Sequence, residues 1–238
     1  DIPRRLNLNN KTIVDSKNHE KLTPKEIIAV SSQVGASKIA LELGYEELRR
    51  NYYNFGFTKP ISINFPSSTF GYMNIKESIS DSELASLGYG YGITMSPFQI
   101  ASAYSVFANS GEYKDFQLLK NEQVTSRKII SNYAASNVLD ALRKVVKDGT
   151  GKAAEIRGFS EGGKTGTVHK IKNGTGYAED SYRASFIGIT PLSDKSLTIF
   201  VSIDEPGLNS YTGGSVAAPV FAKIAESSLN HLGYFEDE

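Results

Sequence analysis

Residues 158–170, GFSEGGKTGTVHK, contain the side chains best suited to chemistry, and they fit two different sites. Gly158, followed after four residues by Gly163, Lys164 and Thr165, matches a phosphate-binding loop. The same lysine begins a Lys-Thr-Gly-Thr box, which on a β-strand could bind the carboxylate of a peptide. The two sites require different elements around Lys164, so the flanking sequence can separate them.

A phosphate loop needs a buried strand before it and a helix after it, because the loop amides and the helix N-terminus hold the phosphates. Residues 149–161, which precede the loop, do not resemble a buried strand. After Thr165 come a glycine, two β-branched residues and an Asn173-Gly174 turn. The sequence therefore favours a strand over a nucleotide site.

On a strand, side chains alternate between the two faces, so Lys164 and Gly166 share one face and Thr165 and Thr167 the other. Lys164 would supply a positive charge and Thr167 a hydroxyl to the terminal carboxylate of a peptide paired along the strand edge. Charge-assisted hydrogen bonds of this kind contribute about 1.5–3 kcal/mol each. Gly166 would let the peptide backbone approach closely. The alternative is an edge strand with a solvated lysine, and the box alone does not decide between them.

The composition excludes several classes of function. The chain has 238 residues, 39% of them hydrophobic and 22% charged, which suits one large domain or two small ones. Its net charge of zero gives no support to nucleic-acid binding. Cysteine is absent, which excludes disulfides, zinc-thiolate sites and a cysteine nucleophile. The three histidines are scattered and show no metal spacing, so no metal site is predicted from them.

The elements that must position the box follow from periodicity and capping signals. Thr23, Pro24 and Glu26 predict a helix start with a capping box. Further helices are predicted at 34–44, 45–57, 96–111, 130–149 and 217–233, and strands at 164–171, 183–192 and 196–206, with a long loop at 58–72. The almost wholly apolar strand at 196–206 predicts cover on both faces and a central position in a sheet. Helices over about 20–150 followed by strands and a last helix over about 155–238 indicate an α+β fold.

Four segments in order resemble the transpeptidase domain of class B penicillin-binding proteins, and most closely its septal cell-division branch. They are SSQVGASKIALELG, GYGYGITMSPFQIASAYSVFANSGEY, GTGKAAEIRGFSEGGKTGT and YTGGSVAAPVFAKI. The resemblance implies the fold shared by penicillin-binding proteins and serine β-lactamases, with a helical subdomain and an antiparallel sheet flanked by helices. It also implies that residues 1–238 are the C-terminal segment of one transpeptidase domain whose N-terminal part is missing.

The resemblance also implies roles for single residues. The family carries Ser-x-x-Lys, Ser-x-Asn and Lys-Thr-Gly motifs. Ser31 and Lys164 match catalytic positions, with Ser31 passing a proton towards the leaving nitrogen. Gln33 stands where the family has an asparagine that contacts the substrate amide. The residues matched to substrate binding are Gln33, Thr165, Gly166 and Thr167. From the sequence alone, Ser31-Ser32 could equally be a helix end followed by the cap of the next helix.

The nucleophile is the main departure from the family. No serine of the sequence has a lysine three residues later. In the family this motif lies upstream of the segment matched here, so we expect the intact protein to supply it. Without a nucleophile the covalent route is closed, and we expect this chain alone to be inactive.

The implied function is that of a peptidoglycan D,D-transpeptidase that cross-links stem peptides during cell division through an acyl-serine and is acylated by β-lactams. The resemblance implies that no metal or cofactor is needed. The partners would be stem peptides ending in D-Ala-D-Ala, β-lactams and other division proteins, with no nucleic acid. The family works on the periplasmic side of the bacterial inner membrane, held by an N-terminal anchor not found in this chain. Three alternatives remain: an inactive penicillin-recognising sensor module, a β-lactamase or D-Ala-D-Ala carboxypeptidase of the same fold, and the nucleotide-binding protein.

Overall fold

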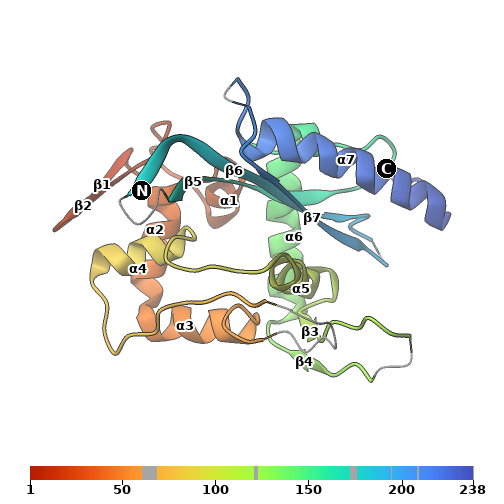
Figure 1. Cartoon of the computed structure of the whole chain (residues 1–238), viewed down its shortest axis with the longest axis horizontal. Coiled ribbons are helices and arrows are strands. Elements are labelled where there is room, and N and C mark those ends of the chain that lie inside the picture. The colour runs from red at the N-terminus through yellow and green to blue at the C-terminus, as the bar shows by residue number, and fades with distance from the viewer. Residues whose placement is uncertain (61–68, 121–122, 172–175, 194, 208, 238) are drawn as a thin grey trace.

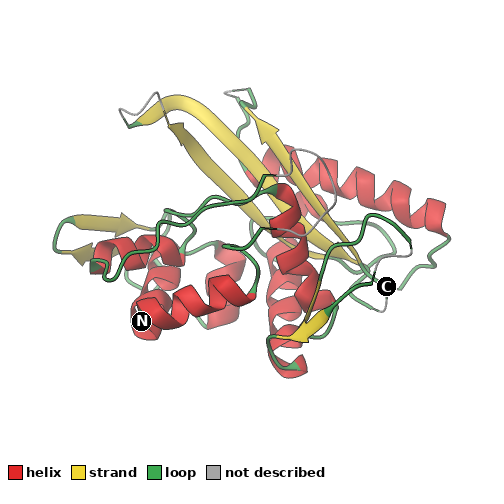
Figure 2. Cartoon of the chain, turned by 60° about the horizontal axis from the view of Figure 1, so that its bottom comes forward, coloured by secondary structure: helices red, strands yellow, loops and turns green. Residues whose placement is uncertain are grey.

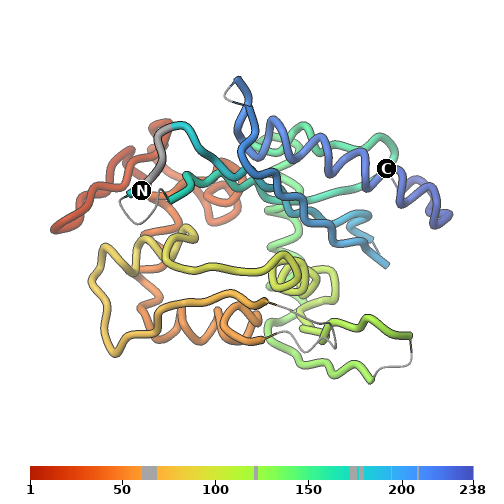
Figure 3. The backbone as a smooth tube through the Cα atoms, viewed as in Figure 1, coloured from red at the N-terminus to blue at the C-terminus, as the bar shows by residue number. Residues whose placement is uncertain are grey.

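The structure is a computed structural model that describes residues 1–60, 69–120, 123–171, 176–193, 195–207 and 209–237 (Figure 1). The predicted turn at Asn173 and Gly174 lies outside the described residues, as does most of the predicted loop at 58–72. Figure 3 follows the chain from the N-terminal hairpin down through the helices below the sheet and back up to the sheet and the last helix.

The elements fall into a mainly helical first part and a second part with three long strands. In chain order they are β1 (Arg5–Leu8), β2 (Lys11–Val14), α1 (Pro24–Val30), α2 (Gln33–Leu43), α3 (Tyr45–Asn54), α4 (Asp81–Gly88), α5 (Pro97–Ala108), β3 (Glu112–Lys114), β4 (Ser126–Lys128), α6 (Asn132–Lys147), the short 3-10 helix η1 (Lys152–Ala154), β5 (Gly162–Ile171), β6 (Tyr177–Thr190), β7 (Leu197–Asp204), the π-helical turn η2 (Gly213–Ala217) and α7 (Ala218–Leu232). The α+β prediction is confirmed.

The predicted helix starts are confirmed by their caps. The Thr23 hydroxyl accepts from the backbone N–H of Glu26, and the Glu26 carboxylate accepts from the backbone N–H of Thr23, which completes the capping box. Ser96 and Ser131 cap α5 and α6 in the predicted way. Helix α4 was not predicted, although Ser80 and Glu83 form a capping box that could have revealed it.

Strands β5, β6 and β7 form an antiparallel sheet in that order, with helices on both faces (Figure 2). A side chain added at Gly188 would meet the ring of Phe221 on α7. On the opposite face, one added at Gly162 would meet the backbone of α6 at Leu142 and Arg143. The faces are therefore closed by two helices, and the β5 edge stays free to line a site.

The apolar core has two centres. One lies between the sheet and α7, where the buried rings of Phe186 and Phe221 pack with centroids 4.9 Å apart. The other joins the β1–β2 hairpin to the helices, through Ile13, Ile27 and Val34. The second centre fixes α1 and α2 against the hairpin, and this arrangement positions the turn between those two helices.

The prediction of a central position for the strand at 196–206 is wrong for the described residues. Strand β7 pairs only with β6 there and forms an edge of the sheet. Leu197, Ile199 and Ile203 pack against the core that contains α7, and α5 also contacts the strand. The apolar residues of β7 therefore indicate that helices cover the faces of this strand. Such cover does not require a paired strand on each side.

Candidate active site

A cavity of about 1080 Å³ opens between the α1–α2 turn and strand β5. All six predicted site residues line it: Ser31, Gln33, Lys164, Thr165, Gly166 and Thr167. Much of the remaining wall is apolar or aromatic and includes Tyr52 and Tyr104. Burial raises the pKa of both phenols to about 12, so these walls stay neutral at physiological pH. The structure thus brings together residues that lie more than 130 positions apart in the sequence.

The contact between Ser31 and Lys164 is the centre of the site. The Nζ of Lys164 donates a hydrogen bond to the Oγ of Ser31. Ser31 ends α1 in the left-handed region, with φ 57° and ψ 44°, which is uncommon for a residue with a side chain. Strained residues of this kind gather at functional sites, held by the structure around them. In this conformation the Ser31 hydroxyl lies against the Lys164 ammonium.

The charge of Lys164 is available to a ligand. Loss of water around the ammonium inside the cavity lowers the pKa of Lys164 from its ordinary value to about 8. Lys164 also donates to the carbonyl oxygen of Thr165 at 2.9 Å and to the Oγ1 of Thr165 at 3.4 Å. All three of these partners are neutral oxygens, and at neutral pH most molecules still carry the ammonium. A carboxylate that enters the cavity would therefore find a positive charge that these contacts have not neutralised.

The Lys-Thr-Gly-Thr box lies on an edge strand with the predicted alternation. Pairing with β6 is regular from Gly162 to His169, which places Lys164 and Gly166 on one face and Thr165 and Thr167 on the other. Because β5 is an edge strand, Lys164 and Thr167 nevertheless line the same cavity. The Oγ1 of Thr167 accepts a hydrogen bond from the backbone N–H of Gly213 at 3.0 Å. Because a hydroxyl has a single proton and accepts through its lone pairs, the exposed Thr167 hydroxyl can still donate to an anion.

Thr150 is a site residue that sequence reasoning missed. Its hydroxyl lies 2.8 Å from the hydroxyl of Thr165, and its backbone N–H donates to the carbonyl oxygen of Ala29 at 3.4 Å. Thr150 therefore connects the end of α1, next to Ser31, with the strand that bears Lys164. Its place in the GTG segment gave no sign of this, because the contact partners are distant in sequence.

The structure confirms the interpretation of the Ser31-Ser32 pair as a helix end followed by a cap, and the catalytic role of Ser31 stays a prediction. Ser31 is the C-cap of α1, and Ser32 caps α2 by accepting from the backbone N–H of Gly35 at 2.8 Å. Gln33 follows as the first residue of α2, and its exposed side chain borders the cavity. By ending α1 and beginning α2, the two serines form the turn that places Ser31 and Gln33 at the cavity.

Packing against the box depends on a glycine at position 213. A Cβ at Gly213 would lie 2.2 Å from the carbonyl oxygen of Ser185 and 2.6 Å from that of Gly166, both of them backbone atoms that cannot rotate away. We expect Gly213→Ala to cost about 1–3 kcal/mol of folding free energy and to break the bond between Thr167 and residue 213. The measurement is the thermal unfolding of the intact protein. The matched control is Gly207→Ala, whose Cβ would meet nothing within 4 Å; equal melting temperatures for the two variants would contradict this packing.

The phosphate-loop alternative is wrong. Lys164 is the third residue of the ten-residue strand β5, and the residues after it continue that strand up to Ile171. A phosphate loop would place a helix N-terminus directly after the lysine. The box therefore belongs to a strand edge, as the flanking sequence indicated.

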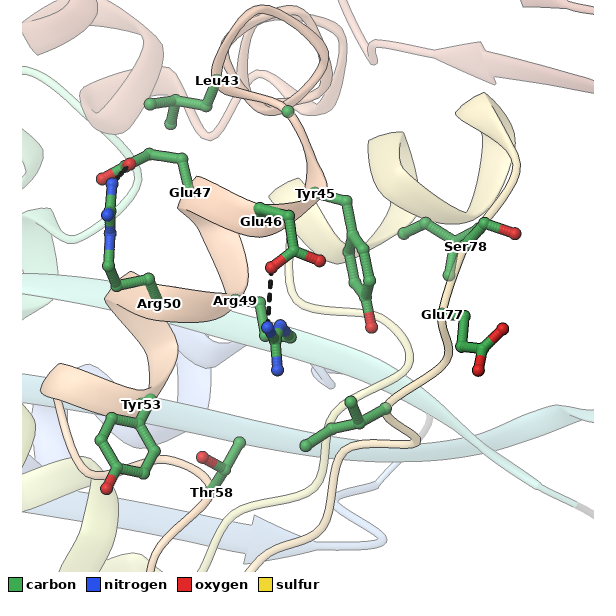
Figure 4. Close-up of a pocket in the computed structure, with 13 residues that line it drawn as sticks. Leu43, Tyr45, Glu46, Glu47, Arg49, Arg50, Tyr53, Thr58, Glu77 and Ser78 are labelled. Carbon is green, nitrogen blue, oxygen red and sulfur yellow. Dashed lines mark hydrogen bonds and ion pairs between the residues drawn. The ribbon is translucent and has the colours of Figure 1, made fainter.

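A second cavity, of about 920 Å³, lies beside α3 and the segment before α4 (Figure 4). None of the predicted site residues lines it. Arg49 donates to the carboxylate of Glu46 at 2.7 Å, and Arg50 forms an ion pair with Glu47. These arginines are thus already engaged by acidic neighbours on their own helix, which makes this cavity a weaker candidate for anion binding than the one at Lys164.

Comparisons with known proteins agree with this geometry. The family model described as the penicillin binding protein transpeptidase domain matches residues 3–226. The chain is 36% identical, over 97% of its length and 41% of the other protein's, to the probable peptidoglycan D,D-transpeptidase PbpC of Pseudomonas aeruginosa. The transpeptidase domain of Burkholderia pseudomallei penicillin-binding protein 3 has a TM-score of 0.91 at 32% identity, covering 99% of this chain and 72% of that one. Penicillin-binding protein 3 of Mycobacterium tuberculosis, complexed with aztreonam, has a TM-score of 0.87 at 25% identity. That match covers 100% of this chain and 58% of the other one.

The chain corresponds to only part of the length of the proteins that it matches. It spans about two fifths of the length of the curated relatives, 41% and 39% for the first two. Among the described residues no helix has the length and apolarity needed to cross a membrane. Nor do the described residues contain a group of three or more His, Cys, Asp or Glu side chains that could hold a metal ion.

Proposed function

Because the chain belongs to the penicillin-binding protein transpeptidase family, we propose that it forms the substrate-binding side of a peptidoglycan D,D-transpeptidase site. The observation that carries the proposal is the Lys164 ammonium, which an edge strand presents to an open cavity in contact with the Ser31 hydroxyl. This arrangement suits an extended peptide that ends in a carboxylate, because the strand edge offers backbone hydrogen bonds and the lysine offers the counter-charge.

In the proposed reaction a serine hydroxyl attacks the carbonyl carbon of the D-Ala-D-Ala bond of a stem peptide. The carbon–nitrogen bond then breaks, and the leaving nitrogen takes up a proton. An amine on a neighbouring peptidoglycan strand then attacks the acyl-serine, which releases the serine and forms the cross-link. β-Lactams would acylate the same serine. A β-lactam would also present its carboxylate to Lys164, as the peptide does.

Each candidate residue has a role in this proposal. Lys164 holds the terminal carboxylate, and the Thr167 hydroxyl donates a second hydrogen bond to it. Ser31 passes the proton to the leaving nitrogen, which its contact with Lys164 supports. Gln33 offers its amide to the substrate, on a stem one methylene longer than that of asparagine. Thr165 and Gly166 complete the strand edge, where Gly166 leaves room for the peptide backbone.

The nucleophile is assigned to the rest of the intact protein. The sequence contains no Ser-x-x-Lys, and the chain spans about two fifths of its curated relatives. One donor of the oxyanion hole would be the backbone N–H of Thr167 and the other that of the acylated serine. Loss of one such donor costs about 2.7–4 kcal/mol of transition-state stabilisation, and loss of the nucleophile closes the covalent route. We therefore expect the isolated chain to form no acyl adduct.

We further propose a role in cell division, on the periplasmic side of the bacterial inner membrane, with other division proteins as partners. The similarity to the transpeptidase domain of a penicillin-binding protein 3 supports this assignment. The membrane attachment would come from a segment outside this chain. Depletion of the intact protein tests the assignment: cells that fail to septate support it, and cells that lose their width or shape while still dividing would point to elongation instead.

The pKa of Lys164 gives this proposal a characteristic pH dependence. Below about 8 the lysine is an ammonium that attracts the ligand carboxylate, and above it the neutral amine does not. We expect the second-order rate constant of β-lactam acylation, which reports the free enzyme, to fall as the pH rises through about 8. Stability should change in the opposite sense. Since the unfolded lysine keeps its ordinary pKa of 10.5, the unfolded state binds more protons between those values, and folding stability rises with pH there. A rate that is flat from pH 7 to 10 would contradict the role of Lys164.

Labelling of the intact protein with a fluorescent penicillin tests the proposed function. A stable covalent adduct on a serine is the expected result. Rapid loss of the adduct, with turnover of the penicillin, would favour a β-lactamase or carboxypeptidase of the same fold. Reversible binding with no adduct would favour the sensor module, an alternative that Gln33 at the position of the family asparagine supports. Absence of both binding and labelling would overturn the proposal.

A further inference from the structure

Asp15 lies next to the site but belongs to none of the family motifs matched above. It follows strand β2 directly, and its side chain is buried, with 5% of the residue exposed. Its Oδ2 accepts a hydrogen bond from the hydroxyl of Ser32 at 2.5 Å, and its Oδ1 accepts one from the backbone N–H of Val34 at 3.1 Å. Both oxygens of this carboxylate therefore hold the first residues of α2.

These contacts form a fixed anchor for the start of α2. A carboxylate at a helix N-terminus is stabilised by the helix dipole and by the free N–H groups of the first turn. Hydrogen bonds to a charged acceptor are stronger than neutral ones. The Ser32 hydroxyl, held as a donor by Asp15, accepts from the backbone N–H of Gly35 at 2.8 Å. One buried carboxylate thus controls both the Ser32 rotamer and the N-cap of the helix.

Asp15 itself is held firmly. Its backbone N–H donates to the carbonyl oxygen of Arg4 at 3.0 Å across the β1–β2 hairpin. Ile13, two residues earlier, is buried in the cluster that contains Ile27 of α1 and Val34 of α2. The anchor therefore connects the hairpin to both helices that flank Ser31.

The position of Ser31 depends on its two neighbours. A left-handed residue with a side chain persists only where the surroundings enforce it. On one side, α1 fixes the backbone through the Ser31 N–H, which donates to the carbonyl oxygen of Ile28 at 3.3 Å. On the other side, the backbone N–H of Ser32 donates to the carbonyl oxygen of Ile27 at 3.0 Å, and its side chain is fixed by Asp15. If the hydrogen bond between Ser32 and Asp15 is lost, the turn can relax and carry the Ser31 hydroxyl away from Lys164.

We propose that Asp15 is a positioning residue, which holds the Ser31 hydroxyl against Lys164 by fixing Ser32 and the start of α2. The inference rests on the proposed function for its readout, because the Ser31–Lys164 pair is expected to act in acylation. Asp15 is not among the residues that line the cavity, and its side chain accepts from Ser32 and Val34, so its effect is transmitted through the α1–α2 turn.

The test uses four variants of the intact protein: Asp15→Ala, Asp15→Asn, Ser32→Ala and Ser131→Ala. Ser131→Ala is the matched control, since it also removes a serine N-cap, but at the start of α6 and outside the residues that line the cavity. The measurements are the second-order rate constant of labelling by a fluorescent penicillin, its pH profile and the melting temperature. Ser32→Ala should lose more stability than Ser131→Ala, because it removes a cap and also leaves a buried Asp15 oxygen without its donor. The rates are therefore compared well below the melting temperature of every variant, where all are folded and a slower rate reports positioning.

We expect Asp15→Ala to label about 10-fold to 10²-fold more slowly than the parent, since small misplacements of reacting groups reduce rates by such factors. Asp15→Asn and Ser32→Ala should be slowed by less, and Ser131→Ala should label at the parental rate. The alkaline limb of the pH profile should move to lower pH in Asp15→Ala, because the Lys164 ammonium loses the Ser31 oxygen as an acceptor. A change in fold stability alone would not move that limb.

The outcomes separate this inference from the proposed function. If the parent protein does not label at all, the proposed function fails. If the parent labels and a folded Asp15→Ala or Asp15→Asn variant matches it in rate and pH profile, the positioning role is overturned. If Asp15→Ala does not fold, the labelling rate of Ser32→Ala tests the positioning role, since this variant removes the hydrogen bond from the Ser32 hydroxyl to Asp15. A parental rate for Ser32→Ala would then overturn the inference.

Discussion

Replacing Lys164 with methionine in the intact protein is expected to slow acylation by a β-lactam about 10²-fold while leaving the fold intact. A charge-assisted hydrogen bond contributes about 1.5–3 kcal/mol, and each 1.4 kcal/mol corresponds to about tenfold. Methionine keeps the length of the side chain and removes the charge. Since the ammonium is partly stripped of water in the cavity, which lowers its pKa, its loss should leave the melting temperature unchanged or raise it.

The measurement for Lys164→Met is the second-order rate constant of labelling by a fluorescent penicillin, beside the melting temperature. Lys223→Met is the matched control, since Lys223 is an exposed lysine of α7 outside the residues that line the cavity, and it should label at the parental rate. If the Lys164→Met protein labels as fast as the control, the Lys164 charge does not hold the ligand carboxylate. A variant that loses both rate and stability would mean that the lysine is mainly structural.

Replacing Arg143 with methionine should destabilise the fold by about 3–5 kcal/mol, because it removes the positive charge that faces a buried carboxylate. Glu161 is fully buried, and its Oε1 accepts from the Nη1 of Arg143 at 2.5 Å. Its Oε2 also accepts from the backbone N–H of Ile156 at 3.2 Å. Glu161 directly precedes β5, so the same change should disturb the strand that bears Lys164. Urea denaturation of the intact protein measures the loss.

A second substitution separates the charge from the packing. If the cost in Arg143→Met comes from a buried negative charge that has lost its counter-charge, adding Glu161→Gln should restore much of the stability, since a neutral amide is less costly to bury than a charge. Exposed charge pairs are worth little, so Lys25→Met, which removes an exposed partner of Asp140, is the control and should change stability by less than about 1 kcal/mol. Equal costs for Arg143→Met and Lys25→Met would refute the buried ion pair.

The sequence predicted those parts of the fold that depend on nearby residues. Thr23, Ser96 and Ser131 carry caps whose partners are three residues away, so their helix starts were predictable. The same logic applies to the box, since Gly166, Thr167 and Val168 after the lysine favour a strand over a helix. The helix ends were less accurate: α3 stops at Asn54, three residues before the predicted end at Phe57.

The long-range part of the site was not predictable from residue pattern alone. The proximity of Ser31 to Lys164 was expected only because the motifs resemble a known family. Asp15, Thr150 and Glu161 gave no signal, because each acts through a partner that the local sequence does not reveal. An aspartate after a strand or a threonine beside glycines has many ordinary roles. Only the packing of the hairpin, α1, α6 and β5 together gives these residues their contacts.

The most direct test of the account is a crystal structure of the intact protein acylated by a β-lactam. The account predicts the ligand carboxylate at about 2.7–2.9 Å from the Nζ of Lys164, within hydrogen-bonding distance of the Thr167 hydroxyl, and the acyl chain along the edge of β5. The opposite result would be a ligand whose carboxylate is bound elsewhere, for instance in the cavity beside α3, with the Lys164 side chain turned out of the site.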